Sequence, residues 1–301
     1  MMRRVLLTGG SGFVAGSVLA QAGEGVEVHV LSRGAALLER DGVCWHSLAS
    51  LDLDGVRGVV RDVAPDAIVH LAAIADIDYC EAHRDEARRA NEVLTGVLAG
   101  CASECGAKMV YSSTDNAFDG KRGLYEEGDS PSPVNFYGRT KVAAEKLVEA
   151  MGENWVVARV SLVMGLPMLS EGNSFLSRMM PVLAAGGEVG VPTEEIRSPV
   201  DVVTLGQALL ELAGNDFSGY IHLSGDDVLS RFEMVRCIAR QLGYRDEQVV
   251  ANDPEGIPGR ADRPRDVSLA NARAHAVLTT SMCGLEEGLE RVLAAADPPK
   301  M

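Results

Sequence analysis

Short apolar runs and helical patterns alternate through the first half of the chain. The runs have the length of strands and are bounded by Gly, Pro or Asp, whereas the stretches between them repeat apolar residues at helical spacing. One such stretch carries Val56, Val59, Val60 and Val63. This alternation predicts right-handed crossovers and a parallel sheet. The six predicted strands cover residues 4–8, 26–31, 43–46, 67–71, 108–113 and 155–161.

The turn after the first strand is rich in glycine. From residue 9 to residue 15 it reads G-G-S-G-F-V-A, which has the form G-x-x-G-x-x-A. Gly9 permits the turn, Gly12 lets the backbone approach a pyrophosphate, and the small Ala15 allows close packing of the helix on the strand. The following helix offers N–H groups and a partial positive charge to phosphates. The turn therefore predicts a dinucleotide site.

After the fourth strand the helical patterns become longer, and the second half of the chain contains one further clear strand. Predicted helices cover residues 81–106, 135–151, 175–183, 202–213, 231–242 and 285–294, and the strand covers 220–224. We predict an α/β fold with a Rossmann-type doubly wound parallel sheet over residues 1–165, to which 199–224 returns. Residues 166–301 are expected to form mainly a smaller C-terminal substrate-binding lobe.

Composition and charge restrict the class of protein. The chain has 301 residues, of which 47% are hydrophobic and 24% charged, and this suits one or two globular domains. The start MMRRVLLTGG lacks a signal-peptide cleavage site and no long apolar run follows, so we expect a cytoplasmic protein without a membrane partner. The net charge of -15 argues against binding to nucleic acid. We expect a monomer or a homodimer.

Cysteines and histidines show no metal-binding spacing. The six cysteines form no C-x-x-C pair, and the six histidines form neither H-x-H nor H-x-x-x-H. Reduced thiols are therefore expected, and no protein-built zinc site is expected.

The end of the second strand bears on the choice of cofactor. Ser32 and Arg33 stand where a site for NAD would carry an acidic residue for the ribose hydroxyls. Ser32 can hydrogen-bond a 2′-phosphate and Arg33 can pair with it, so the site favours NADP(H), with NAD(H) possible. The alternative is that Arg33 points into water.

Candidate chemistry lies between the fifth strand and the next helix. Ser112, Ser113 and Thr114 end the strand, where ligands bind in open α/β sheets. Tyr137 and Lys141 are four residues apart on a predicted helix and share one face. A nearby ammonium would lower the phenol pKa from about 10 and allow proton exchange near neutral pH. Taken alone, such a pair more often belongs to an exposed helix that it stabilises, and the glycine turn at the start of the chain is what favours the chemical role.

These residues resemble a known family. The segment S-T-D-N-A-F-D-G at residues 113–120 is similar to the S-T-D-Y-V-F-D-G of the dTDP-4-dehydrorhamnose reductase family of extended short-chain dehydrogenases/reductases. The segment P-V-N-F-Y-G-R-T-K at residues 133–141 is similar to its P-L-N-V-Y-G-x-x-K. The chain departs from the family at Asn116, at Ala15, and at His70-Leu71, where family members have an asparagine before the Ala-Ala pair.

The resemblance implies reduction at C4 of a nucleotide-linked 4-keto-6-deoxy sugar by NADPH. Tyr137 would protonate the developing alkoxide, Thr114 would share that hydrogen bond, and Lys141 would bind the nicotinamide ribose. Asp115 and Asn173 are assigned to the substrate, and Arg197 and Arg263 to its diphosphate, unless these arginines lie at the surface. The cofactor set is Gly9, Ser11, Gly12, Phe13, Val14, Ser32, Arg33, Leu71, Ala72, Ala73, Ser112, Ser113, Tyr137 and Lys141.

Related activities remain as alternatives. A 4,6-dehydratase of the superfamily needs an acid and a base after the threonine, and Asn116 cannot take a proton, so elimination of water is disfavoured. An epimerase with tightly held NAD(P) stays possible. The family resemblance also includes non-catalytic NADP-binding regulatory subunits such as the beta subunit of methionine adenosyltransferase.

Overall fold

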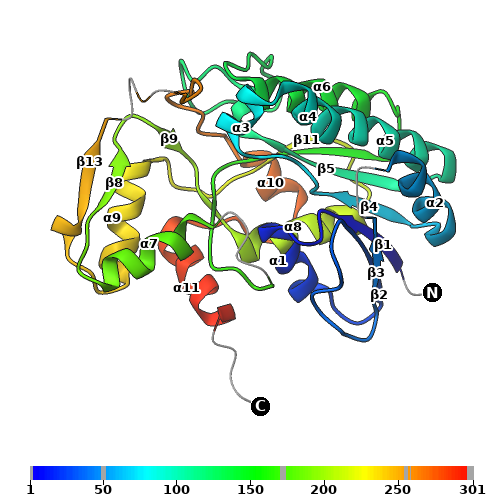
Figure 1. Cartoon of the computed structure of the whole chain (residues 1–301), viewed down its shortest axis with the longest axis horizontal. Helices are drawn as coiled ribbons and strands as arrows, with labels where there is room; N and C mark the ends of the chain where they lie inside the picture. Colours follow the sequence, from blue (N-terminus) through cyan, green and yellow to red (C-terminus); the bar gives the residue numbers. More distant parts are fainter. Residues whose placement is uncertain (1–2, 49–51, 170–173, 254–256, 258, 297–301) are drawn as a thin grey trace.

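Seven parallel strands form the central sheet, in the order β11-β6-β5-β4-β1-β2-β3 (Figure 1). The computed structural model describes residues 3–48, 52–169, 174–253, 257 and 259–296. The chain builds the sheet outward from β1 to β3 and then continues on the other side of β1 with β4, so the strand order reverses between β1 and β4. Ligands bind at such a reversal in doubly wound sheets. The strands are β1 (Arg3–Thr8), β2 (Val26–Ser32), β3 (Val43–Ser47), β4 (Ala67–His70), β5 (Lys108–Thr114), β6 (Trp155–Val160) and β11 (Gly219–Leu223).

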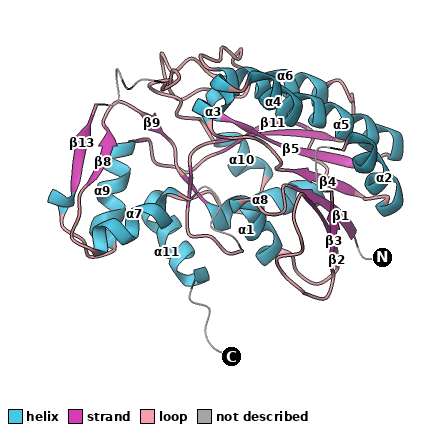
Figure 2. Ribbon diagram, in the orientation of Figure 1, coloured by secondary structure: helices cyan, strands magenta, loops and turns pink. Residues whose placement is uncertain are grey.

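Helices cover both faces of this sheet (Figure 2). Side chains alternate along β1, so Val5 and Leu7 join the core under one helix layer while Leu6 joins the core under the other. The first layer consists of α1 (Phe13–Gln21), α8 (Val202–Gly214) and α10 (Ala272–Val277), and the second of α2 (Leu53–Val63), α5 (Leu94–Cys105) and α6 (Phe136–Glu149). The predicted α/β fold with a doubly wound parallel sheet is therefore confirmed.

The helical region predicted over residues 81–106 is confirmed, but its first half is not one continuous α-helix. Two short helices, α3 (Ile77–Ala82) and α4 (Arg84–Arg88), and a π-helical turn at Arg89–Val93 precede α5. The wide turn carries the buried Asn91, whose Oδ1 accepts from the N–H of Ile74 at 2.8 Å and whose Nδ2 donates to the Ile74 carbonyl at 3.0 Å. This amide fixes the loop after β4, which explains why the regular periodicity is interrupted.

A smaller lobe with its own apolar core adjoins the carboxyl edge of the sheet. It contains the helices α7 (Phe175–Ala184), α9 (Arg231–Gln241) and α11 (Leu285–Ala296). It also contains two strands of four residues each, β8 (Val189–Pro192) and β13 (Val249–Asn252). Two-residue strands connect it to the rest: β7 (Val163–Met164) pairs with β10 (Val200–Asp201), and β9 (Ile196–Arg197) with β12 (Leu229–Ser230). Among the described residues, no helix combines the length and the apolar character needed to cross a membrane.

Candidate active site

The glycine turn brings the N-terminus of α1 to the carboxyl edge of the sheet. Gly9 has a φ of 75°, and a β-carbon there would lie 2.8 Å from the backbone nitrogen of Ala72. The N–H of Gly12 donates to the Gly9 carbonyl at 2.8 Å and closes the turn. Among the described residues no side chain caps α1, and its first turn holds no carboxylate. The N–H groups and the positive end of the helix dipole can therefore receive a phosphate.

Gly9→Ala should lower the free energy of unfolding by about 1–2 kcal/mol, because a β-carbon is disfavoured at this φ and would also contact Ala72. Urea unfolding measures the loss. The matched control is Gly23→Ala, where nothing lies within 4 Å of an added β-carbon. Equal stability of the two variants would contradict the strain assigned to Gly9.

The end of β2 places a free cation at the open edge of the sheet. Arg33 is exposed and forms no ion pair with any described residue. Ser32 is buried, and its hydroxyl donates to the Gly34 carbonyl at 2.8 Å. Both residues were expected to bind a 2′-phosphate, and of the two it is Arg33 whose side-chain N–H groups are available to do so.

The end of β4 is held by a buried histidine. His70 Nδ1 lies 2.6 Å from Thr8 Oγ1, and its Nε2 lies 2.9 Å from Thr95 Oγ1. Burial, with a smaller effect of Lys141, lowers the His70 pKa to about 3, so the ring is neutral. His70 is thus a structural residue. The Ala72 N–H donates to Thr8 Oγ1 at 3.3 Å, which fixes the backbone against the glycine turn.

One cleft of about 590 Å³ brings the predicted chemical residues together. Thr114 ends β5, Tyr137 and Lys141 lie on the first two turns of α6, and all three line the cleft. The side chain of Asn135 starts that helix by accepting from the Gly138 N–H at 2.8 Å. The glycine turn lines the same cleft through Gly9 and Gly12, among others. A ligand on the turn would therefore extend towards Tyr137.

Burial controls the protonation of Tyr137 and Lys141. We expected Lys141 to lower the pKa of Tyr137, but burial raises the pKa of this phenol, and a hydrogen bond from Thr114 opposes the increase. Tyr137 is therefore protonated near neutral pH and suited to give a proton. Burial lowers the pKa of Lys141 to about 7, while Glu145 raises it. The Lys141 Nζ donates to the Ser112 carbonyl at 2.6 Å.

A buried ion pair between Arg159 and Glu145 lies next to Ser113, which lines the cleft. The Ser113 hydroxyl donates to Glu145 Oε1 at 2.5 Å, and Arg159 Nη2 donates to Glu145 Oε2 at 2.9 Å. Both charged side chains are almost fully buried, with 2% of Arg159 and 1% of Glu145 exposed. The Arg159 guanidinium also lies over the rings of Phe118 and Tyr220, at 5.0 and 4.7 Å from their centroids. The pair thus connects β5, α6 and β6 beneath the candidate site.

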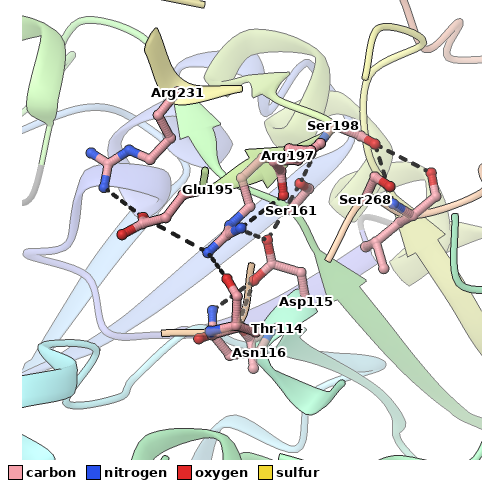
Figure 3. A network of polar contacts seen from close by, with 12 residues as sticks. Thr114, Asp115, Asn116, Ser161, Glu195, Arg197, Ser198, Arg231 and Ser268 are labelled. Carbon is pink, nitrogen blue, oxygen red and sulfur yellow. Dashed lines mark hydrogen bonds and ion pairs between the residues drawn. The ribbon is translucent and has the colours of Figure 1, made fainter. Parts of the chain in front are cut away.

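Asp115 and Arg197 form the centre of a polar network (Figure 3). Arg197 Nε lies 3.7 Å from Asp115 Oδ2, and its Nη1 donates to the carbonyls of Ile196 and Arg265 at 2.7 and 3.1 Å. Burial raises the pKa of Asp115, although Arg197 lowers it. Asn116 Nδ2 donates to Asp115 Oδ1 at 2.8 Å. Arg197 therefore links the lobe to the end of β5 and has much of its guanidinium already engaged.

Other arginines line the cleft opposite the sheet. Arg263 Nη2 pairs with Asp78 Oδ2 at 3.0 Å, and Arg231 Nη1 pairs with Glu195 Oε2 at 3.3 Å. Arg178 lines the cleft as well. The sequence pattern did not predict Arg178, Arg231 or Glu195 as residues of this site. A capping box at Ser230 made the start of α9 recognisable, but nothing in the sequence shows that this helix directs Arg231 to the cleft.

Most of the residues predicted from sequence meet in this cleft, while their roles stay predictions. Ser11, Ser32, Arg33 and Ala72 do not line it, and Asn173 lies outside the described residues. Those that line it are Gly9, Gly12, Phe13, Val14, Leu71, Ala73, Ser112, Ser113, Thr114, Asp115, Tyr137, Lys141, Arg197 and Arg263.

A family model described as the RmlD substrate binding domain matches residues 2–297. The chain belongs to the RmlD substrate-binding domain family. A dTDP-4-dehydrorhamnose reductase from Mycolicibacterium smegmatis is 29% identical over 300 residues, which cover 98% of this chain and 86% of the relative. Methionine adenosyltransferase 2 subunit beta from Bos taurus is 29% identical over 276 residues, covering 90% of this chain and 81% of the relative.

A solved structure of a dTDP-4-dehydrorhamnose reductase has the same architecture. The crystal structure of dTDP-4-dehydrorhamnose reductase from Bacillus anthracis in complex with NADP has a TM-score of 0.84 to this chain at 27% identity. The match covers 97% of this chain and 99% of that one. The resemblance predicted from the sequence is confirmed.

Proposed function

We propose that this protein is an NADPH-dependent reductase of a nucleotide-linked 4-keto-6-deoxy sugar, and that it reduces the C4 carbonyl. The observation that carries the proposal is the shared cleft: Thr114, Tyr137 and Lys141 line the same space as the glycine turn. Relatives named dTDP-4-dehydrorhamnose reductase, one of them in complex with NADP, support this choice among the activities of the fold.

The residues at the carboxyl edge fit a dinucleotide. The position of Gly9 disfavours a β-carbon, and α1 begins without a capping side chain among the described residues, so a pyrophosphate can approach the backbone. Arg33 would pair with the 2′-phosphate, and Lys141 would bind the nicotinamide ribose. When bound, NADPH supplies a hydride to the carbonyl carbon.

The protein's own residues manage the proton in this reduction. The Tyr137 hydroxyl, protonated because of its raised pKa, would donate to the substrate oxygen as negative charge develops there. Thr114 would donate a second hydrogen bond to the same oxygen. After the transfer Tyr137 is a phenolate, which the protonated form of Lys141 would stabilise.

The cationic side of the cleft suits a nucleotide diphosphate. Arg178, Arg231 and Arg263 line it, and Arg263 also borders an open depression of about 930 Å³. We propose that Arg231 and Arg263 contact the diphosphate directly, whereas Arg197 contributes through its position beside Asp115. Their ion pairs with Glu195 and Asp78 would then be exchanged for phosphate oxygens.

Replacing Arg33 with alanine should reduce the preference for NADPH over NADH by about 10- to 100-fold, because a charge-assisted hydrogen bond to the 2′-phosphate is lost. Dissociation constants of both cofactors test this. Arg61→Ala removes an exposed arginine from α2 and serves as the control. An unchanged ratio in Arg33→Ala would place the 2′-phosphate elsewhere.

A second candidate is a regulatory subunit, since methionine adenosyltransferase 2 subunit beta is as similar to this chain as the reductase from M. smegmatis. NADPH consumption with a panel of nucleotide-linked 4-keto-6-deoxy sugars separates the two. The reductase proposal expects turnover with one sugar of the panel. Tight NADPH binding without turnover on any of them would favour the regulatory function, and cofactor retained through purification would favour an epimerase.

A further inference from the structure

The edge of the sheet farthest from β11 carries a cluster of metal-binding side chains. β3 is the edge strand and pairs in parallel with β2, with His29 opposite Cys44. Because alternate residues of a strand share a face, Glu27 lies on the same face as His29, and His46 on the same face as Cys44. These residues are separated along the sequence, and the pairing of β2 with β3 brings them together.

The three potential ligand atoms lie close together, and one pair of them has the spacing expected around one ion. A ligand oxygen of Glu27, a ring nitrogen of His29 and the Sγ of Cys44 all lie within 4.8 Å of one another. Glu27 Oε1 and His29 Nε2 are 3.5 Å apart. Two ligand atoms bound tetrahedrally to zinc at their usual distances of about 2.1 Å would be about 3.4 Å apart.

His29 is prepared to act as a ligand. Its Nδ1 lies 2.9 Å from His46 Nε2, and the two rings stack with their centroids 5.2 Å apart. Its Nε2 is buried and makes no hydrogen bond to any described residue. In the tautomer in which Nδ1 donates to His46, Nε2 carries a lone pair 3.5 Å from Glu27 Oε1. Metal-bound histidines are commonly held by such a hydrogen bond from the other ring nitrogen.

We propose that Glu27, His29 and Cys44 form a binding site for a divalent transition-metal ion, with zinc the best match. A nitrogen, a sulfur and a carboxylate oxygen are its usual donors, and the thiolate and carboxylate together balance the charge of the ion. Binding releases the thiol proton of Cys44. Cys44 is exposed, so the ion can enter from solvent and keep a water as its fourth ligand. The ion would fix the edge strand β3 to β2.

Cobalt(II) titration of the full-length, chelator-treated protein tests the site, because cobalt reports thiolate ligation by a near-ultraviolet charge-transfer band. The matched control is Cys105→Ser, which removes another exposed thiol outside the cluster. We expect the band in the wild type and in Cys105→Ser, displacement of cobalt by zinc, and loss of the band in Cys44→Ser with binding at least about tenfold weaker.

A second variant separates a built site from a chance thiol. Glu27→Gln should keep the thiolate band but bind cobalt about tenfold or more weakly, since a charged ligand becomes neutral. Circular dichroism confirms that each variant is folded. No thiolate band in the wild type, or equal affinity in the wild type, Cys44→Ser and Glu27→Gln, would overturn the proposal and leave a hydrogen-bonded histidine pair without a metal.

Discussion

Tyr137→Phe is expected to lower the turnover number by about 10²- to 10⁴-fold, the usual contribution of a positioned general acid. The substitution removes the hydroxyl and keeps the aromatic ring, so the packing around this ring of α6 is preserved. Since the phenol is protonated near neutral pH, its loss removes the proton source rather than a base. NADPH affinity should change by no more than a few fold, because the glycine turn and Arg33 are untouched.

Steady-state kinetics with NADPH and a substrate from the panel give the turnover numbers, and fluorescence titration gives cofactor affinity. Tyr244→Phe, in the loop after α9 and outside the cleft, is the matched control and should retain activity. Turnover by Tyr137→Phe close to that of the control would show that Tyr137 is not the proton donor.

Arg159→Met is expected to lower the free energy of unfolding by about 3–5 kcal/mol, which makes it the largest effect on stability. Arg159 is buried and donates through both Nε and Nη2 to Glu145, at 3.1 and 2.9 Å. Methionine fills much of the space between Phe118 and Tyr220 but leaves the Glu145 carboxylate without its cation. Urea denaturation measures the change.

Three further variants, Arg61→Met, Glu145→Gln and the double variant Glu145→Gln/Arg159→Met, show whether charge burial is the cause. Arg61→Met breaks an exposed pair with Asp62, at 3.7 Å, and should change stability by less than about 1 kcal/mol. The double variant Glu145→Gln/Arg159→Met should lose less than the sum of the single variants, because neither charge then remains alone. Additive losses, or equal losses for Arg159→Met and Arg61→Met, would contradict the assignment.

The sequence predicted the sheet because each of its strands is a short local segment that carries several apolar residues and is followed by turn residues or a helical pattern. The residues 108–113, for example, read K-M-V-Y-S-S, and the observed β5 extends this range by one residue to Thr114. The turn at Gly9 was also recognisable, since a strand, two spaced glycines and a helix follow one another locally. Local patterns of this kind need no knowledge of distant contacts.

The remaining features depend on contacts between distant segments. The π-helical turn forms because Asn91 bonds Ile74 and Thr140, a choice that helical periodicity does not encode. The strands β8 and β13 were not predicted, because each is short and its partner lies 60 residues away along the chain, from Val189 to Val249. The pKa of Tyr137 follows burial, whereas its spacing from Lys141 suggested the opposite direction. Similarly, only the structure shows that the Arg197 guanidinium donates to backbone carbonyls such as that of Ile196.

The most direct test of the reductase proposal is the fate of the hydride. A reaction with NADPH deuterated at the transferred position and a nucleotide-linked 4-keto-6-deoxy sugar is analysed by mass spectrometry and NMR. The account predicts one deuterium at C4 of the product and one NADP⁺ formed for each molecule reduced. A product without deuterium, or no oxidation of NADPH with any sugar of the panel, would contradict it.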